Sequence, residues 1–385
     1  MDVLPAPLGV YIHWPYCARI CPYCDFNVVR ERGRTMEQAA LVDAIAADLM
    51  AQAAMLGPRT LVSVYLGGGT PSLMMPEQAG RLIALCKALW PATDTVGTDA
   101  VEVTLEANPG DADEARLVAF RGAGVGRLSL GVQALNDTDL AFLGRNHDAA
   151  TARHSIAAAV GVFPRLSLDL IYALPGQTEG AWRTTLAETA GFGVEHISAY
   201  ELTIEAGTPF DRAVRRGRFS PADEVQGAAF YEATNTALNA LGFEAYEVSN
   251  YARGAEAQAR HNLVYWRGED YVGAGPGAHG RLTLGQGRHA TEAERKVGNY
   301  IARVNTSGVG FAATPPLTAT ERAEERVFMG LRTFEGVAVG DLAPLPLGRL
   351  PDLIGDGLLV QRQGRLIATP RGRLLLNRVC EALAN

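Results

Sequence analysis

The sequence of 385 residues predicts an α/β fold followed by a smaller α+β domain. Three observations support this prediction. Short apolar runs alternate with longer helical patterns through the first two hundred residues, which is typical of repeated β/α units on a parallel sheet. This alternation stops after Leu202, and a pattern of helices and a hairpin begins at Ala319. Length alone is consistent with two or three domains.

The apolar runs predict six strands, at residues 9–13, 61–66, 101–107, 127–132, 166–171 and 196–202. The segments between them predict helices over residues 35–56, 76–90, 111–121, 148–160 and 178–191. Pro76 and Thr178 are typical of helix starts, and Gly57 and Gly122 of helix ends. Six units are too few to close an eight-stranded barrel, so the pattern leaves both an open barrel and a doubly wound sheet open.

The second half of the chain is less regular. A predicted helix at 222–241 precedes a strand-like segment at 244–248 and a glycine-rich stretch at 268–287 that is too irregular for a helix. Beyond it we expect a helix at 320–331, strands at 358–361 and 365–368, and a last helix at 370–383, an order that resembles a winged helix. We therefore predict three domains, at 1–210, 211–318 and 319–385.

The charge balance excludes some function classes. Thirty-five Lys and Arg against 42 Asp and Glu give a net charge of −7, which argues against a main role on nucleic acid. The first residues show neither the charged nor the apolar region of a signal peptide, and we find no uninterrupted apolar run of the ~20 residues that a spanning helix needs. We expect a cytoplasmic protein.

Three cysteines are the most informative residues of the chain. Cys17, Cys21 and Cys24 follow C-x3-C-x2-C spacing, and three thiolates can hold three irons of a cubane cluster while the fourth iron keeps an open position. Structural zinc normally has four ligands, so a zinc site would need His13 or Asp25 as well. Zinc remains an alternative, whereas a disulfide framework is disfavoured in a chain of this size.

Unusual residues follow successive predicted strands. Residues 67–71 read Gly-Gly-Gly-Thr-Pro after the second strand, Glu106 ends the third, Gln133 ends the fourth and Asp169 lies in the fifth. Because the C-terminal ends of parallel strands open on one mouth, these residues should converge. Each has a structural alternative: a sharp turn, a solvated carboxylate, or a polar side chain satisfied by protein. Arg145 fits either a surface position or the carboxylate of a ligand.

Together these motifs resemble the radical S-adenosylmethionine (SAM) superfamily, in the branch of oxygen-independent coproporphyrinogen III dehydrogenase. Tyr-x-His precedes the cysteines, and Gly-Gly-Gly-Thr-Pro, Glu-Ala-Asn-Pro, Gly-Val-Gln and Asp-Leu-Ile-Tyr follow in the family's order. The resemblance implies a six-stranded partial (β/α)6 barrel, a 4Fe-4S cluster on the three cysteines, and SAM on the fourth iron as source of a deoxyadenosyl radical. It assigns to the SAM pocket Tyr11, Gly68, Gly69, Thr70, Glu106, Gln133, Arg145, Asp169 and Thr203.

Three features separate the chain from the dehydrogenase. Phe26 occupies the position of a further cysteine in the dehydrogenase pattern, and only ten residues precede Tyr11. Residues 260–266 contain His-Asn-x2-Tyr-Trp, which resembles the signature of HemW-type heme chaperones. This likeness implies that His261 binds heme iron, with His279 as a weaker second candidate, although a hydrogen-bonded structural role for His261 stays equally open. We expect the nearby glycine-rich stretch to cap the barrel mouth.

The favoured hypothesis is a heme chaperone that binds a 4Fe-4S cluster and SAM and transfers heme to apo-hemoproteins. The alternative is an enzyme, the radical oxidative decarboxylase of coproporphyrinogen III, and a third class is a zinc-stabilised binding module. Heme, recipient apo-hemoproteins and an electron donor for the cluster are the implied partners, and a homodimer is left open. A peripheral place at the membrane through recipient proteins is also left open.

Overall fold

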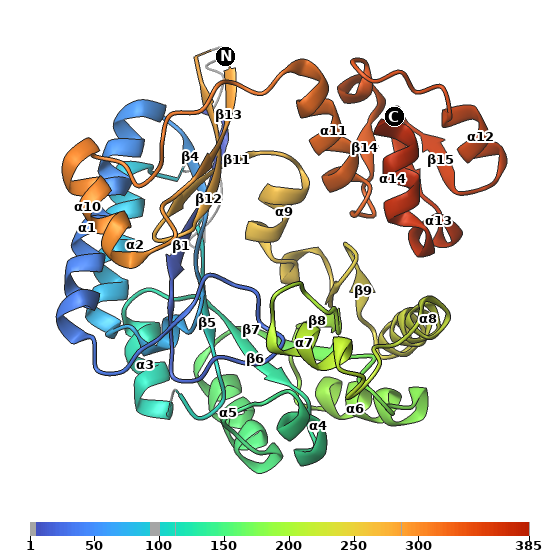
Figure 1. Ribbon diagram of the computed structural model, residues 1–385, viewed down its shortest axis with the longest axis horizontal. Coiled ribbons are helices and arrows are strands. Elements are labelled where there is room, and N and C mark those ends of the chain that lie inside the picture. The colour runs from blue at the N-terminus through green and yellow to red at the C-terminus, as the bar shows by residue number, and fades with distance from the viewer. Residues whose placement is uncertain (1–4, 93–100, 112, 286, 385) are drawn as a thin grey trace.

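One curved sheet carries most of the molecule (Figure 1). The computed structural model describes residues 5–92, 101–111, 113–285 and 287–384; the expected absence of a signal peptide concerns a segment of which residues 1–4 lie outside these ranges. Among the described residues the sheet has eleven strands in the order β13-β12-β11-β1-β4-β5-β6-β7-β8-β10-β9. Its strands are β1 (Pro7–Trp14), β4 (Thr60–Gly68), β5 (Glu102–Ala107), β6 (Arg127–Gln133), β7 (Arg165–Tyr172), β8 (His196–Glu201), β9 (Glu244–Ala245), β10 (Asn250–Ala252), β11 (Asp270–Ala274), β12 (His279–Leu284) and β13 (Gly287–Glu292).

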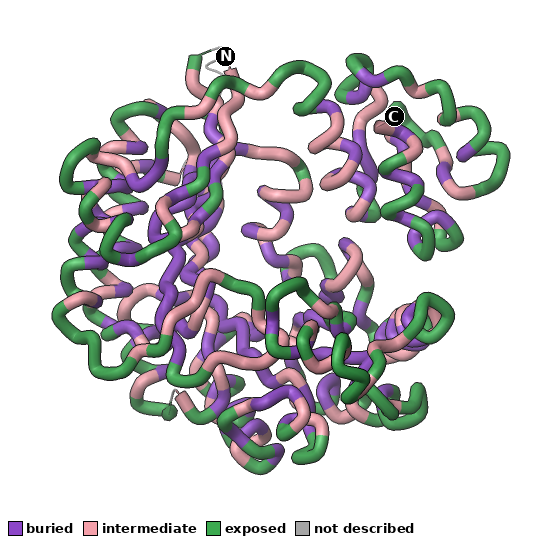
Figure 2. Tube along the Cα trace, viewed as in Figure 1, coloured by how far each residue is buried: buried purple, intermediate pink, exposed green. Residues whose placement is uncertain are grey.

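The six predicted strands are confirmed, and they lie side by side in chain order. Strands β1, β4, β5, β6, β7 and β8 pair in parallel, each with the next. Residues from both faces of these strands are buried, because helices cover one face and the barrel interior the other (Figure 2). All their C-terminal ends therefore open at one edge, as the sequence pattern requires.

The helices that connect these strands match the predictions to within a few residues. They are α1 (Thr35–Leu56), α2 (Pro76–Leu89), α3 (Glu114–Gly122), α5 (Ala149–Val162) and α6 (Glu179–Gly191), with short helices α4 (Asp137–Phe142) and α7 (Pro209–Arg215) in loops and α8 (Glu224–Ala240) beyond β8. The predicted start of α3 at Asp111 is too early, since Asp113 caps the helix by accepting a hydrogen bond from the amide of Arg116; Ala112 lies outside the described residues.

Helix α1 alters one expectation from the sequence. By length and composition alone it could cross a membrane, although we had found no sufficiently long apolar run. In the fold it packs against α2, α10 (Val297–Ser307) and β11, and half of its most apolar window is buried. Its Asp48 carboxylate is buried and accepts hydrogen bonds from Tyr300 and Gln52. The apolar face of α1 is thus part of the protein core.

The glycine-rich stretch extends the sheet, which the sequence analysis missed. β11 pairs in parallel with β1, and β12 and β13 add an antiparallel hairpin at that edge. Gly275 has φ +107°, and a Cβ there would lie 2.4 Å from the His13 carbonyl oxygen, so glycine is required where the chain turns against β1. The predicted strand at 244–248 forms only the two residues of β9 before the chain bends into β10.

The C-terminal segment has a hydrophobic core of its own. Helix α11 (Ala319–Gly330) packs against α14 (Leu376–Ala384), beside a sheet in the order β14-β16-β15 (Val337–Ala338, Arg365–Ala368 and Leu359–Arg362) and helix α12 (Leu350–Gly355). The single predicted helix at 370–383 is wrong: it is split at Leu375 into α13 (Pro370–Leu374) and α14. Helix α11 also contacts α9 (Arg260–Trp266), so this segment lies beside the His-Asn-x2-Tyr-Trp motif (Figure 1).

Candidate functional site

The cysteine loop is held at both of its ends. Strand β2 (Tyr16–Cys17) pairs in parallel with β3 (Val29–Arg30), which brings the two ends of the loop together. His13 Nε2 donates to the Asn27 carbonyl at 2.9 Å, and the Asn27 side chain donates to the Pro276 carbonyl at 2.8 Å. The glycine-rich stretch around Pro276 therefore braces the loop from outside. It does not border the cavity described next, so the expectation that it caps the mouth is wrong.

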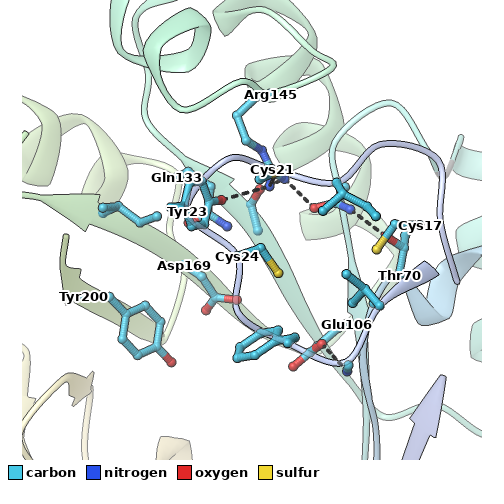
Figure 3. Close-up of a pocket in the computed structure, with 18 of the residues that line it drawn as sticks. Cys17, Cys21, Tyr23, Cys24, Thr70, Glu106, Gln133, Arg145, Asp169 and Tyr200 are labelled. Atoms are coloured by element: carbon cyan, nitrogen blue, oxygen red, sulfur yellow. Dashed lines mark hydrogen bonds between the residues drawn. The ribbon is translucent and has the colours of Figure 1, made fainter. Parts of the chain in front are cut away.

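The three cysteines and the strand ends surround one cavity of about 540 Å³ (Figure 3). Figure 3 shows Cys24 between the carboxylates of Glu106 and Asp169, with Arg145 on the side of Cys21. Nearly all the residues expected at the site border this cavity: Cys17, Cys21, Cys24, Gly68, Gly69, Thr70, Glu106, Gln133, Arg145, Asp169 and Thr203. The convergence expected from successive strand exits is therefore present in the structure.

Tyr11 is the expected pocket residue that does not border this cavity. Its hydroxyl donates to His13 Nδ1 at 3.0 Å, and its ring contacts Tyr65. The Tyr-x-His motif thus supports the cysteine loop, because Tyr11 fixes the ring of His13, which in turn holds the loop carbonyl of Asn27.

The thiol groups of the cysteine loop are partly buried and do not converge on one point. Burial raises the pKa of Cys17 to about 11 and raises the pKa of Cys24 as well, so a metal must displace protons to bind them. Over the residues that the structure describes, no three His, Cys, Asp or Glu side chains converge on one point as a mononuclear zinc site would require. A cubane cluster needs no such convergence, because each thiolate binds a different iron.

Arg145 connects the cysteine loop to the strand ends. Its Nη1 donates to Cys21 Sγ at 3.3 Å and to the Tyr23 hydroxyl at 3.2 Å, and its Nη2 donates to the Gly131 carbonyl at 2.9 Å and to the Asn108 side chain. The guanidinium thus joins the sulfur of Cys21 to the ends of the strands. Arg145 is consequently a residue of the cavity wall, and its surface alternative is wrong.

Sequence reasoning missed several residues of this wall. Asn108 donates to Thr70 Oγ1 at 3.0 Å, and Thr70 Oγ1 in turn donates to Cys17 Sγ at 3.5 Å. Tyr23 and Tyr200 also border the cavity. Asn108 could have been found, because it belongs to the Glu-Ala-Asn-Pro stretch, in which only Glu106 was singled out.

The two carboxylates of the cavity are unusual acids. Glu106 accepts hydrogen bonds from the Tyr65 hydroxyl at 2.7 Å and the Gly68 amide at 3.0 Å. Burial raises its pKa to about 7, and the neighbouring Asp169 adds to this effect. Burial also raises the pKa of Asp169, although the Ser129 hydroxyl donates to it at 2.6 Å. Such perturbed acids at one cavity are typical of a site that binds a charged ligand.

Backbone geometry at the strand ends is equally unusual. Gly69 is required because a Cβ would lie 2.7 Å from the Tyr16 carbonyl oxygen, so the cysteine loop itself approaches this glycine closely. Gln133 has φ +69°, a left-handed conformation that is costly for a residue other than glycine, and it follows an irregular register between β6 and β7. Strained residues of this kind cluster at functional sites.

His261 lies outside this cavity, buried between α9 and the sheet. Its Nδ1 is 2.8 Å from Ser63 Oγ, its Nε2 is 2.7 Å from the Tyr265 hydroxyl, and its ring stacks on Tyr65 with centroids 4.8 Å apart. Both ring nitrogens of His261 are hydrogen-bonded and the residue is only 1% exposed, so neither nitrogen is free in this structure. This environment favours the hydrogen-bonded structural role for His261, and ligation of heme iron by His261 stays a prediction. His279, the second candidate, is exposed at the start of β12.

Comparisons with known proteins agree with this geometry. Residues 11–188 match the model of the radical SAM superfamily, and residues 317–375 match the HemN C-terminal domain. A relative from Mycobacterium tuberculosis named heme chaperone HemW is 35% identical over 98% of this chain and 95% of its own length. The mitochondrial radical S-adenosyl methionine domain-containing protein 1 of Bos taurus is 38% identical over 96% of this chain and 84% of its own length.

A solved structure shares the fold. The coproporphyrinogen III oxidase HemN of Escherichia coli superposes with a TM-score of 0.79 at 22% identity, covering 99% of this chain and 91% of that one. The family implies a 4Fe-4S cluster and SAM, and when bound such a cluster supplies one electron to the sulfonium of SAM. The chain belongs to the radical SAM superfamily, as a member of its HemN/HemW-like branch.

Proposed function

We propose that this protein is a heme chaperone: it binds a 4Fe-4S cluster and SAM, takes up heme and passes it to apo-hemoproteins. The observation that carries the cofactor assignment is the single cavity bordered by Cys17, Cys21 and Cys24. Similarity over nearly the whole chain to relatives named heme chaperone HemW supports the heme assignment.

Each cavity residue has a specific part in this proposal. The three thiolates hold the cluster, and Arg145 positions Cys21 by donating a hydrogen bond to its sulfur. The SAM moiety binds among the strand ends, with Glu106 and Asp169 accepting hydrogen bonds from its amino or ribose groups. Because Asn108, Thr70 and Arg145 are bonded to one another or to the cysteines, the donors are in place before the ligand arrives.

The test is anaerobic reconstitution with iron and sulfide, followed by titration with heme. We expect a thiolate-iron absorption band, stoichiometric heme binding, and transfer of that heme to an apo-hemoprotein. Failure to develop the band would contradict the cluster. Conversion of coproporphyrinogen III to protoporphyrinogen by the reconstituted protein with SAM would establish the decarboxylase alternative instead.

We propose a cytoplasmic location, with contact at the membrane only through recipient proteins. Fractionation of cells that express the full chain tests this, since recovery in the membrane fraction in the absence of recipients would contradict it.

A further inference from the structure

A row of polar side chains lies on the inner face of two neighbouring strands. Because side chains alternate between the two faces of a strand, Ser167 and Asp169 of β7 share one face, and so do His196 and Ser198 of β8. The parallel register places Ser167 opposite His196 and Asp169 opposite Ser198. Of these four residues, all in the described part of the chain, only Asp169 borders the cavity that the three cysteines border (Figure 3). The other three are buried.

A buried chain of hydrogen bonds leads away from the Asp169 carboxylate. The Ser167 hydroxyl donates to Asp169 Oδ1 at 3.1 Å, and Ser167 Oγ lies 2.8 Å from His196 Nδ1. On the other side of the ring, His196 Nε2 lies 2.9 Å from the Tyr246 hydroxyl. The Ala259 amide donates to this hydroxyl at 3.3 Å. The chain thus connects the cavity to the residue just before α9.

Both ends of this chain require the same direction of donation. At one end the single proton of the Ser167 hydroxyl is directed at Asp169, so Ser167 accepts from His196 Nδ1. At the other end the Ala259 amide can only donate, so the Tyr246 hydroxyl accepts from it and keeps its own proton for His196 Nε2. The ring of His196 therefore carries its proton on Nδ1.

The environment keeps the His196 ring neutral. Burial lowers its pKa well below the usual value, and Arg127 and Arg165 act in the same direction. A neutral imidazole has one donating and one accepting nitrogen, which is what the two contacts of this ring need. Every donor of the chain then points toward Asp169. Hydrogen bonds that are aligned in this way polarise one another, which strengthens the last of them, to the carboxylate.

The Asp169 carboxylate needs this support because it is buried. Burial raises its pKa, and hydrogen bonds from Ser129, Ser198 and Ser167 act against the rise. The Ser129 hydroxyl donates to Oδ2 at 2.6 Å, so each carboxylate oxygen accepts a hydrogen bond from the protein. An ionised carboxylate oxygen can accept a second donor. Both oxygens are therefore held in place and still able to accept from a ligand in the cavity.

We propose that His196 is a positioning residue for SAM: through Ser167 it fixes the Asp169 carboxylate in the orientation in which it accepts hydrogen bonds from the ligand. The proposal rests on the proposed place of SAM among the strand ends and does not depend on heme. His196 and Ser167 do not border the cavity, so they act on SAM binding through Asp169 and not by contact.

The test is equilibrium dialysis of SAM with the anaerobically reconstituted protein. Ser167→Ala removes the hydroxyl that donates to Asp169, and His196→Leu removes the donor behind it, so each should bind SAM about tenfold more weakly. His196→Asn should stay within about threefold of wild type, because its side-chain amide can place an N–H near the position of Nδ1. The control Thr234→Val breaks a buried hydrogen bond from Trp182, outside the cavity, and should leave SAM binding unchanged.

A second measurement determines the direction of the chain without SAM. In the proton–nitrogen correlation spectrum of the histidine rings of the full chain, the signal that His196→Asn removes should belong to a neutral ring with its proton on Nδ1. A proton on Nε2 would overturn the proposal.

The outcomes of dialysis separate this proposal from the proposed function. If the wild-type protein binds no SAM, both are wrong. If it binds SAM and both Ser167→Ala and His196→Leu bind it equally well, only the role of His196 is wrong. Equal weakening in His196→Leu and His196→Asn would show a purely structural role and overturn the proposal as well. Melting temperatures identify any variant that does not fold, and Ser167→Ala, which removes a single oxygen, then decides.

Discussion

We expect the free energy of unfolding of the ligand-free protein to decrease as the pH rises, because the carboxyl group of Glu106 is buried and its ionisation is unfavourable there. The substitution that tests this is Glu106→Gln, which removes the ionisable carboxyl group and keeps the shape of the side chain. In the folded chain the pKa of Glu106 is raised from 4.5 to about 7. A raised pKa of an acid means that the folded state binds the proton more tightly. Stability therefore falls as the pH rises from 4.5 to 7, and the penalty is complete above 7.

The magnitude follows from the size of this difference. If the whole pKa difference of Glu106 between folded and unfolded protein is realised, the destabilisation above pH 7 is about 3 kcal/mol. Glu106 borders a cavity that admits water, so a penalty of about 1–2 kcal/mol is the more realistic value. Glutamine can accept from only one of the two present donors, Tyr65 and Gly68, which costs about 1 kcal/mol at every pH. The pH-dependent part of the comparison is therefore the informative one.

The assay is urea denaturation of metal-free, reduced protein at pH 5 and pH 7.5. We expect the free energy of unfolding of Glu106→Gln, relative to wild type, to increase by about 1–2 kcal/mol between these two pH values. Glu232→Gln, an exposed substitution on α8, serves as the control and should show no such change. A difference between variant and wild type that stays constant with pH, or decreases, would refute the reasoning.

The remaining predictions concern the cysteines, the strained glutamine and the motif histidine. Cys24→Ser should lose the thiolate-iron absorption band after reconstitution. The control Cys86→Ala, which lies in the core away from the cavity, should keep the band and lower the free energy of unfolding by about 1 kcal/mol. Equal iron content in the two variants would contradict the cluster assignment. Gln133→Gly and Gln363→Gly each remove the backbone strain of a left-handed residue, so each should raise the free energy of unfolding by up to about 1 kcal/mol. Gln133 borders the cavity, so only its substitution should weaken SAM binding, by about tenfold in equilibrium dialysis. Burial lowers the pKa of His261 to about 3, so the stabilisation from its neutral ring is complete above pH 6.5 and decreases as the pH falls. The loss of unfolding free energy caused by His261→Gln should therefore be about 2 kcal/mol smaller at pH 5 than at pH 7. An equal loss at both pH values would show that the ring is not buried in its neutral form.

Much of the barrel could be predicted because its strands are buried on both faces. Such strands have continuous apolar sequences, and each of the six apolar runs corresponds to one of the six parallel strands, which lie next to one another in chain order. Strands β11, β12 and β13 were not predicted, because the glycines that permit their close packing interrupt the apolar pattern of the sequence. At Gly273, for example, a Cβ would lie 2.0 Å from the carbonyl oxygen of His279.

The site divides in the same way. Residues at strand exits could be placed by topology alone, because parallel strands bring their ends together whatever their separation in the chain. The burial of His261 could not, since it depends on how α9 packs against β4 and β1. Nor could the cavity between β11 and α11, since residues as distant in sequence as Tyr271 and Phe328 border it.

Transfer of heme is the measurement that tests the central claim most directly. The reconstituted protein is loaded with one equivalent of heme, freed of excess heme by gel filtration, and mixed with an apo-hemoprotein whose activity returns when heme arrives. We predict that activity returns faster than with an equal amount of heme on albumin, and that the same protein with SAM leaves coproporphyrinogen III unchanged. No heme retained on the column, together with formation of protoporphyrinogen, would contradict the account.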